Sequence, residues 1–328
     1  MPNFLDTYKD PDLGTTIQFE GEEYTIERFL GSGGMASAYQ TKNSKGDKVV
    51  FKIYKNLTRE AREKVQTGYQ IRRRFPDISK KKLVFPQNGN FTHTKPAVIY
   101  NYVEGDTTGN EADLMTEVDQ KVHTGRRLIS EVMPTLELLR KKGIAHRDLK
   151  GGNLIMDKNE PRTTLLDFDF VTEIDNMYQS TVWGTPYFIS PEQAEGRTSE
   201  TMDIFSLGVT VVDNYFPHLA TTARLTNGDT SPFEIVRYRH YSPLTRSPEI
   251  QKQILNLDAY PESIRAETYG LLKFIIAALQ PDPNERPRSA KESSQLLAMT
   301  PNISMHYGTI QTTKTPRITS KLKVNHKC

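Results

Sequence analysis

The chain has 328 residues, which is enough for about two domains. Its 43 Lys and Arg residues nearly balance its 40 Asp and Glu residues, and apolar residues together with glycine reach about 42% of the chain, close to the globular average of about 45–50%. This composition excludes a disordered protein, a fibre and a membrane channel.

The single cysteine, Cys328, cannot form an internal disulfide, which predicts a reducing compartment. The N-terminus lacks the basic start and apolar run of a signal peptide, and the longest apolar stretch is too short to cross a membrane. We therefore expect a cytoplasmic chain without a transmembrane segment, with a secreted effector acting in a host cytosol as the alternative.

Positive charge gathers at the C-terminal end. Residues 300–328 hold five basic residues and no acidic residue, while the remainder of the chain is mildly acidic. A mildly acidic body argues against nucleic-acid binding. The end segment is rich in Thr, Ser, Lys and Asn and is interpreted as a flexible basic tail; contact with an acidic partner or a membrane surface is the alternative.

Alternating apolar residues and turn residues predict a strand-rich first third. Residues 1–23 are weakly patterned and are interpreted as an N-terminal extension. A helix is expected from Thr58 to Phe75, where Thr58 is suited to cap the first turn. The expected strands lie at residues 24–31, 37–42, 48–55, 83–89 and 96–105.

Longer apolar segments with helical spacing follow Gly109 and predict buried helices at residues 128–139, 202–212 and 269–280. The pattern therefore indicates an α+β protein in two parts. A small antiparallel-sheet part at residues 24–104 carries one main helix, and a larger, mostly helical part occupies residues 105–299.

Two features of the strand-rich part are suited to binding phosphate. Glycines in the segment Leu30–Tyr39 let the backbone approach an anion closely, although an ordinary bulged hairpin explains them equally well. Lys52 alternates with apolar residues on an expected central strand, where its ammonium needs an anionic partner unless it reaches solvent.

A second group of polar residues lies in the helical part. The segment Ile144–Met156 places Asp148, Lys150 and Asn153 in a short loop, and Asp167 ends an apolar strand soon after. Asp167 and Asn153 offer the hard oxygen ligands that Mg²⁺ takes beside substrate phosphates. Asp148 is suited to accept or orient a hydroxyl proton, and Lys150 to neutralise charge on a moving phosphoryl group.

These residues belong to a longer series of short motifs in a fixed order. The series is Gly31-x-Gly33, Lys52, His146-Arg147-Asp148-Leu149-Lys150-x-x-Asn153, Asp167-Phe168, Gly184-Thr185-Pro186, Ser190-Pro191-Glu192, Asp203-Ile204-Phe205-Ser206-Leu207-Gly208 and Glu285-Arg286-Pro287. Over about residues 24–298 it resembles the eukaryotic-type (Hanks-type) serine/threonine protein kinases. The resemblance implies a bilobal kinase fold, with a small antiparallel-sheet lobe and a larger helical lobe.

The resemblance also implies a role for each matching residue. Asp148 would be the catalytic base, Lys150 would neutralise the transferred group, and Lys52 would hold the α- and β-phosphates of ATP. Asn153 and Asp167 would bind Mg²⁺, with Mn²⁺ as a substitute. The residues expected to contact ATP are Gly31, Ser32, Gly33, Gly34, Ala38, Val50, Lys52, Asn101, Val103 and Leu154.

The activation segment of such kinases would run from Asp167 to Glu192. Phosphorylation of Ser180 or Thr181 would order this segment by pairing with Arg147, unless these hydroxyls are simply solvated. Glu192 and Arg286 would form a buried structural ion pair beneath the segment.

The sequence departs from the family pattern in the glycine loop and after Asp167. Ala36 replaces the third glycine of the loop, and Ala38 replaces the valine that follows. Asp169 replaces the glycine of an Asp-Phe-Gly motif, which is expected to restrict a flip of this segment.

The glutamate that should reach Lys52 from the helix at 58–75 is less clearly marked. Of the two candidates, Glu60 and Glu63, we predict Glu63, although counting back from the flanking segments favours Gln66 or Gln70. A glutamine facing Lys52 would replace the ion pair with a weaker neutral contact, and activity would then need another carboxylate or a partner.

Lys150 and Thr185 match the serine/threonine-specific pattern of the family rather than the tyrosine-specific one. The expected function is ATP-dependent phosphorylation of Ser and Thr hydroxyls in protein substrates, with autophosphorylation. One alternative is a pseudokinase scaffold with little turnover, which Asp169 and Ala36 motivate. Another is a small-molecule kinase, against which the segment 184–192 counts because it builds the peptide-binding floor in protein kinases.

Overall fold

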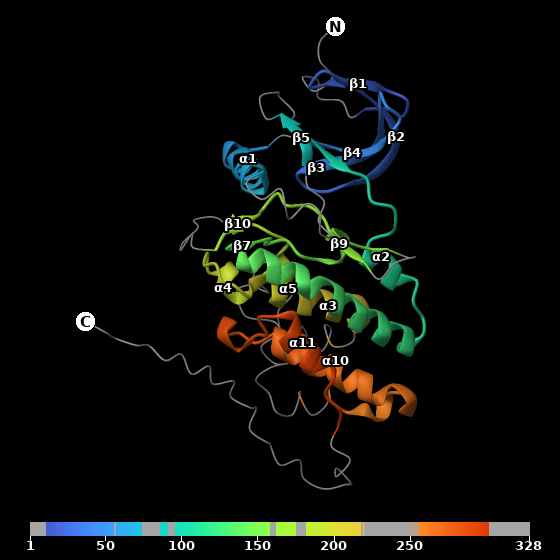
Figure 1. The fold of residues 1–328 in the computed structure, drawn as a ribbon, viewed down its shortest axis with the longest axis vertical. Coiled ribbons are helices and arrows are strands. Elements are labelled where there is room, and N and C mark those ends of the chain that lie inside the picture. The colour runs from blue at the N-terminus through green and yellow to red at the C-terminus, as the bar shows by residue number, and fades with distance from the viewer. Residues whose placement is uncertain are drawn as a thin grey trace, which may run out of the picture.

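The computed structural model describes residues 11–55, 57–73, 86–90, 96–157, 162–174, 182–217, 219, 251 and 255–301. Within them, an antiparallel-sheet lobe stands on a larger, mostly helical lobe (Figure 1). This arrangement confirms the bilobal α+β organisation expected from the sequence. The expected phosphosites Ser180 and Thr181, and the tail beyond residue 301, lie outside the described residues.

The small lobe is built on a six-stranded antiparallel sheet in the order β1-β2-β3-β4-β6-β5. The sheet begins before residue 24, where the sequence pattern placed its start, because Ile17 and Phe19 alternate into the apolar core of the sheet. The strands are β1 (Thr16–Phe19), β2 (Glu22–Ser32), β3 (Ala36–Asn43), β4 (Lys48–Tyr54), β5 (Pro86–Asn90) and β6 (Ala97–Asn101).

Strand β4 is central, as its apolar alternation predicts. Its residue Lys52 pairs with Ala38 on β3 and with Val98 on β6. Asn43 closes the β3–β4 hairpin. Its Oδ1 accepts hydrogen bonds from the N–H groups of Lys45 and Asp47, at 3.1 and 2.8 Å. The hairpin register therefore fixes the position of Lys52 in the sheet.

Helix α1 (Arg59–Arg73) packs against the sheet and confirms the expected helix. Thr58 Oγ1 accepts the N–H of Ala61 at 3.2 Å, which caps the first turn. On the buried side of the helix, Val65 and Tyr69 join an apolar cluster with Tyr54 of β4.

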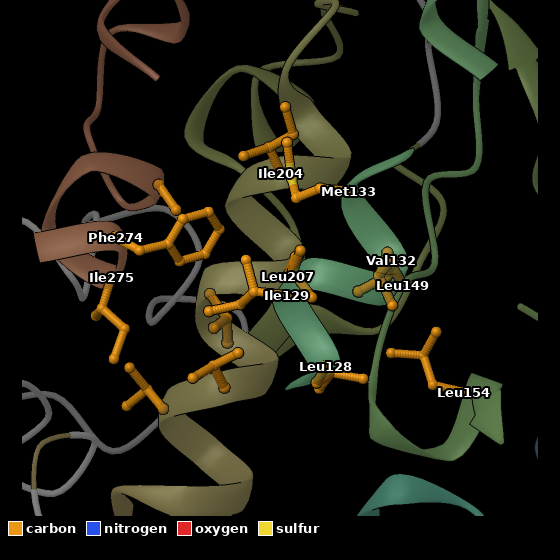
Figure 2. Packing of buried hydrophobic residues seen from close by; sticks show 14 of the residues in the cluster. Leu128, Ile129, Val132, Met133, Leu149, Leu154, Ile204, Leu207, Phe274 and Ile275 are labelled. Atoms are coloured by element: carbon orange, nitrogen blue, oxygen red, sulfur yellow. The ribbon is translucent and has the colours of Figure 1, made fainter. Parts of the chain in front are cut away.

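The large lobe packs its helices around one extended apolar core. Helices α3, α5 and α10 contact one another there, and Figure 2 shows Leu128, Leu207 and Phe274 among the side chains that fill it. The helices are α2 (Thr108–Asp113), α3 (Val118–Lys141), α4 (Pro191–Ala194), α5 (Met202–Tyr215), α10 (Arg265–Ala278) and α11 (Ala290–Leu297). No helix in the described part of the chain is long and apolar enough to cross a bilayer.

Two short two-stranded antiparallel sheets of the large lobe lie on the side that faces the small lobe (Figure 1). Strand β7 (Ile144–Ala145) pairs with β10 (Thr172–Glu173), and β8 (Leu154–Met156) pairs with β9 (Thr163–Leu165). The segments that follow β7 and β9 carry the polar motifs, so the fold brings those motifs to the boundary between the lobes.

A buried ion pair ties α4 to the segment that precedes α11. The Arg286 guanidinium donates two hydrogen bonds to the Glu192 carboxylate, at 2.6 and 2.9 Å, and both side chains are at most 2% exposed. Burial alone would raise the pKa of Glu192, but Arg286 holds that pKa below its ordinary value. Ser199 and the carbonyl of Gln280 complete the hydrogen bonding of the pair, at 2.6 and 2.7 Å.

Removing one partner of this pair leaves a buried charge uncompensated. We expect Arg286→Met to lower the free energy of unfolding by about 3–5 kcal/mol, measured by urea denaturation. The double variant Glu192→Gln/Arg286→Met buries no charge and is expected to recover part of that loss. A single variant as stable as the wild type would contradict a structural role for the pair.

Candidate active site

The loop after β7 is held by a carboxylate from the large lobe. Asp203, in the first turn of α5, accepts the backbone N–H groups of His146 and Arg147 at 2.6 and 2.8 Å, one on each carboxylate oxygen. Burial raises the pKa of Asp203. Arg147 has a φ of 71°, a left-handed conformation that costs energy for a non-glycine residue, and the two bonds hold it there.

His146 is a structural member of this loop. Its Nε2 lies 2.8 Å from the carbonyl oxygen of Leu166, and its ring meets the edge of Phe168 with a centroid distance of 4.7 Å. The histidine therefore connects the loop to the segment that contains Asp167.

Asp148 is buried and surrounded by hydrogen-bond donors. The Thr185 hydroxyl donates to one carboxylate oxygen at 2.6 Å, and Lys150 Nζ donates to the other at 2.9 Å. Lys150 Nζ also lies 2.6 Å from Thr185 Oγ1, so the three side chains form a closed triangle. Sequence reasoning missed the contact between Thr185 and Asp148, although the place of Thr185 in a recognised motif is the signal that marks it.

Asn153 belongs to the same group. Its amide nitrogen donates to the Asp148 carbonyl at 2.7 Å and to the Asp148 carboxylate at 3.1 Å, which commits the nitrogen to the protein and leaves the amide oxygen as the end suited to a cation. The carbonyl of Asn153 accepts a hydrogen bond from the N–H of Leu166 at 2.8 Å. Because Leu166 precedes Asp167, this bond holds the backbone of Asp167 close to Asn153.

These oxygen donors fit a magnesium ion that is shared with a phosphate. No group of three or more His, Cys, Asp or Glu side chains in the described segments forms a metal cage of its own. Mg²⁺ is commonly bound through one or two carboxylates together with substrate phosphates and waters. Asp167 and Asn153 match that sparse ligand set.

Lys52 reaches the same place from the other lobe. Its ammonium lies 2.7 Å from Asp167 Oδ1 and 2.6 Å from Asp169 Oδ2, and its side chain is 14% exposed. Burial alone would lower the pKa of Lys52, but the two carboxylates outweigh it and raise that pKa above the ordinary value. In the same way, Lys52 holds the pKa of Asp167 below its ordinary value despite burial.

The prediction that Glu63 pairs with Lys52 is wrong in this structure. Glu63 lies on the exposed side of α1 and bonds to Arg59 one turn earlier, at 2.8 Å. The alternatives Gln66 and Gln70 are exposed as well. The helical repeat places all three side chains on the face of α1 that turns away from the sheet. The residues on the opposite face, which packs against the sheet, are small or uncharged.

The structure places Leu154, the nucleotide contact predicted from β8, in the interior of the large lobe. Leu154 has no exposed surface and belongs to the large-lobe core (Figure 2). Successive side chains on a strand face opposite sides, so the neighbouring Ile155 is the residue of β8 that turns toward the connection between the lobes. A Cβ added to Gly105 would lie 2.9 Å from the Ile155 side chain.

The glycine loop forms the turn between β2 and β3. The N–H of Gly33 donates to the carbonyl of Ala36 at 2.9 Å, and a Cβ added at Gly31, Gly33 or Gly34 would meet nothing within 4 Å. Lys55 Nζ bonds to the Ser32 hydroxyl and to the Gly33 carbonyl. The loop backbone is thus fixed at its base while the space beside its glycines stays open.

The other residues expected at a nucleotide site lie near this loop or close to β6. Ala38 is opposite Lys52 in the sheet, and Asn101 is exposed at the end of β6. Val50 and Val103 pack against the apolar cluster that also contains Tyr100. These sheet-lobe residues therefore lie on or beside strands β2, β3, β4 and β6.

Two cations lie close together where the loop approaches α1. Burial lowers the pKa of Arg147 to about 10. Burial, reinforced by the charge of Arg147, lowers the pKa of Lys64 to about 8, and the Lys64 ammonium donates to the carbonyl of Val171 at 3.4 Å. The region is therefore electrostatically suited to an added anion.

The family model of the protein kinase domain matches residues 24–297. The chain belongs to the protein kinase domain family. It is 27% identical to the serine/threonine-protein kinase PksC of Streptomyces coelicolor over 286 residues, which cover 83% of this chain and 48% of that one. It is 27% identical to serine/threonine-protein kinase D of Synechocystis over 209 residues, covering 58% of this chain and 40% of that one.

A similarity to a yeast protein and to a solved structure agrees with this assignment. The chain is 26% identical to the MAP kinase kinase MKK1/SSP32 of Saccharomyces cerevisiae over 266 residues, covering 78% of this chain and 49% of that one. The crystal structure of the PF14_0431 kinase domain shares the fold, with a TM-score of 0.61, 14% identity, and coverage of 89% of this chain and 98% of that one. The chain spans about half or less of the length of the three sequence relatives.

The lowered pKa of Lys64 makes a pH-dependent contribution to stability. The folded state releases the Lys64 proton near pH 8, whereas an unfolded lysine keeps its proton up to about pH 10.4. Between these two pH values the unfolded state binds more protons, so the free energy of unfolding rises by at most about 1.4 kcal/mol per pH unit. We expect the free energy of unfolding of the wild type to rise relative to Lys64→Met from pH 8 to about 10. Parallel pH profiles of the two proteins would contradict this expectation.

Proposed function

We propose that this protein kinase transfers the γ-phosphoryl group of ATP to Ser and Thr hydroxyls of protein substrates, and also phosphorylates itself. The observation that carries the proposal is the closed triangle of Asp148, Lys150 and Thr185. It places an acceptor carboxylate beside a lysine, and this lysine–threonine combination follows the serine/threonine pattern of the family.

The residues divide the chemistry between them. Asp148 accepts a hydrogen bond from the substrate hydroxyl and takes its proton as the hydroxyl oxygen bonds to the γ-phosphorus. The bond from that phosphorus to the β-phosphate oxygen breaks at the same time, and ADP leaves. Lys150 lies beside Asp148 and neutralises negative charge on the phosphoryl oxygens. Lys52 holds the non-transferred phosphates in line.

A divalent cation fits beside Asp167 and Asn153. We propose that these two residues hold Mg²⁺, or Mn²⁺ in its place, and that the ion neutralises charge on the ATP phosphates. Leu154 stays among the proposed nucleotide contacts, and its neighbour Ile155 lies against the connection at Gly105. The remaining nucleotide contacts would come from Gly31, Ser32, Gly33, Gly34, Ala38, Val50, Asn101 and Val103.

Regulation by phosphorylation is proposed at Ser180 or Thr181. A phosphate there would pair with Arg147, and Lys64 would supply a second cation. Burial lowers the pKa of Lys64 in the unmodified protein, and repulsion from Arg147 lowers it further. An added anion would relieve that repulsion and order the segment against α1.

Autophosphorylation gives the direct test of transfer. We expect purified protein incubated with Mg-ATP to gain mass in steps of one phosphate, on serine and threonine residues only, as read by intact and peptide mass spectrometry. Asp148→Ala should slow this gain at least about a hundredfold because the proton acceptor is lost.

Nucleotide binding, measured by calorimetry, separates the possible outcomes. Wild-type protein that binds Mg-ADP but gains no phosphate and modifies no protein substrate would favour a nucleotide-binding scaffold. Phosphate gain by Asp148→Ala at the wild-type rate would overturn the role given to Asp148.

A further inference from the structure

Helix α1 brings no carboxylate to Lys52 among its described side chains. The residues of α1 that face the sheet and the Asp167–Asp169 segment include Val65, Gly68 and Tyr69, all of them buried and none of them acidic. Within the described part of the chain, the carboxylates that bond to the Lys52 ammonium come from the segment after β9. The charge that a helix glutamate would supply therefore comes from that segment.

Asp169 is built into the protein as a partner for Lys52. Its side chain is 5% exposed, and one of its oxygens lies 2.6 Å from Lys52 Nζ. The other oxygen accepts the Tyr54 hydroxyl at 2.7 Å and lies 3.5 Å from the Tyr100 hydroxyl. Three donors from the sheet thus satisfy a carboxylate that would be costly to bury alone.

Gly68 makes this arrangement possible. A Cβ at this position would lie 2.8 Å from the Asp169 carbonyl oxygen and 2.9 Å from the Phe168 carbonyl oxygen. The helix backbone therefore packs directly on the segment that carries Asp169, and no side chain fits between them. The absence of a side chain at Gly68 thus lets the backbone of the segment lie against α1.

The two carboxylates around Lys52 differ in exposure. The Asp167 side chain is 32% exposed and can turn to a cation, whereas Asp169 is enclosed. We propose that Asp169 is the positioning residue for Lys52, in place of a helix glutamate, and that it keeps hold of the ammonium when Asp167 engages a metal ion. This inference rests on the proposed function, since it assigns Lys52 to the phosphates of ATP.

A matched pair of neutralising substitutions tests the proposal. Asp169→Asn and Glu63→Gln each remove one charge with little change of shape. We expect Asp169→Asn to lower kcat for phosphorylation of a protein substrate about a hundredfold, as a misplaced group does, and to weaken Mg-ADP binding about tenfold in calorimetry. Glu63→Gln should change both quantities less than about twofold. Asp169→Glu, which keeps the charge, should recover part of kcat.

The outcomes distinguish this proposal from the proposed function. A wild type without phosphoryl transfer would defeat the function, and the Mg-ADP affinity of the two variants would still decide the role of Asp169. Equal effects of Asp169→Asn and Glu63→Gln, or no effect of Asp169→Asn, would overturn the proposal. If Asp169→Asn does not fold, Tyr54→Phe, which removes one donor to Asp169, should lower kcat several-fold, and an unchanged kcat would overturn the proposal.

Discussion

A lysine ammonium held between two carboxylates joins the lobes of this protein. Lys52 belongs to the central strand of the sheet, while Asp167 and Asp169 belong to the large lobe, and the ammonium lies 2.7 and 2.6 Å from their oxygens. Burying one of these charges alone would be expensive, so the three groups depend on one another for their stability. The placement of the sheet relative to the segment after β9 depends on this cluster.

A second set of buried polar groups fixes the catalytic loop itself. Asp203 holds the backbone at His146 and Arg147, and Gln193 donates to the carbonyls of Arg147 and Trp183 at 2.9 and 2.7 Å. Gly184 permits this close contact, since a Cβ there would lie 2.7 Å from the Arg147 carbonyl oxygen. The loop carrying Asp148 is therefore supported by both α5 and α4.

Local patterns in the sequence predicted much of the fold but only part of the site. Apolar alternation and capping predicted β4 and α1, and the ordered motifs predicted that Lys52 and Asp167 belong together. The sequence pattern failed at Glu63, because the partner of Lys52 comes from Asp169, more than a hundred residues away, and no local period reports such a contact.

Because the partner of Lys52 is Asp169 and not a helix glutamate, a movement of α1 alone would not separate the ion pair. In the family, a lysine and a helix glutamate can be separated by moving the helix, independently of the metal-binding aspartate. Here Asp167 and Asp169 lie on one short segment, and the Tyr54 hydroxyl clamps that segment to the sheet. A displacement of the segment would remove both carboxylates at once. Under the proposed roles, the Lys52 partner and the metal ligand therefore depend on the position of one segment, on which the backbone of α1 packs at Gly68.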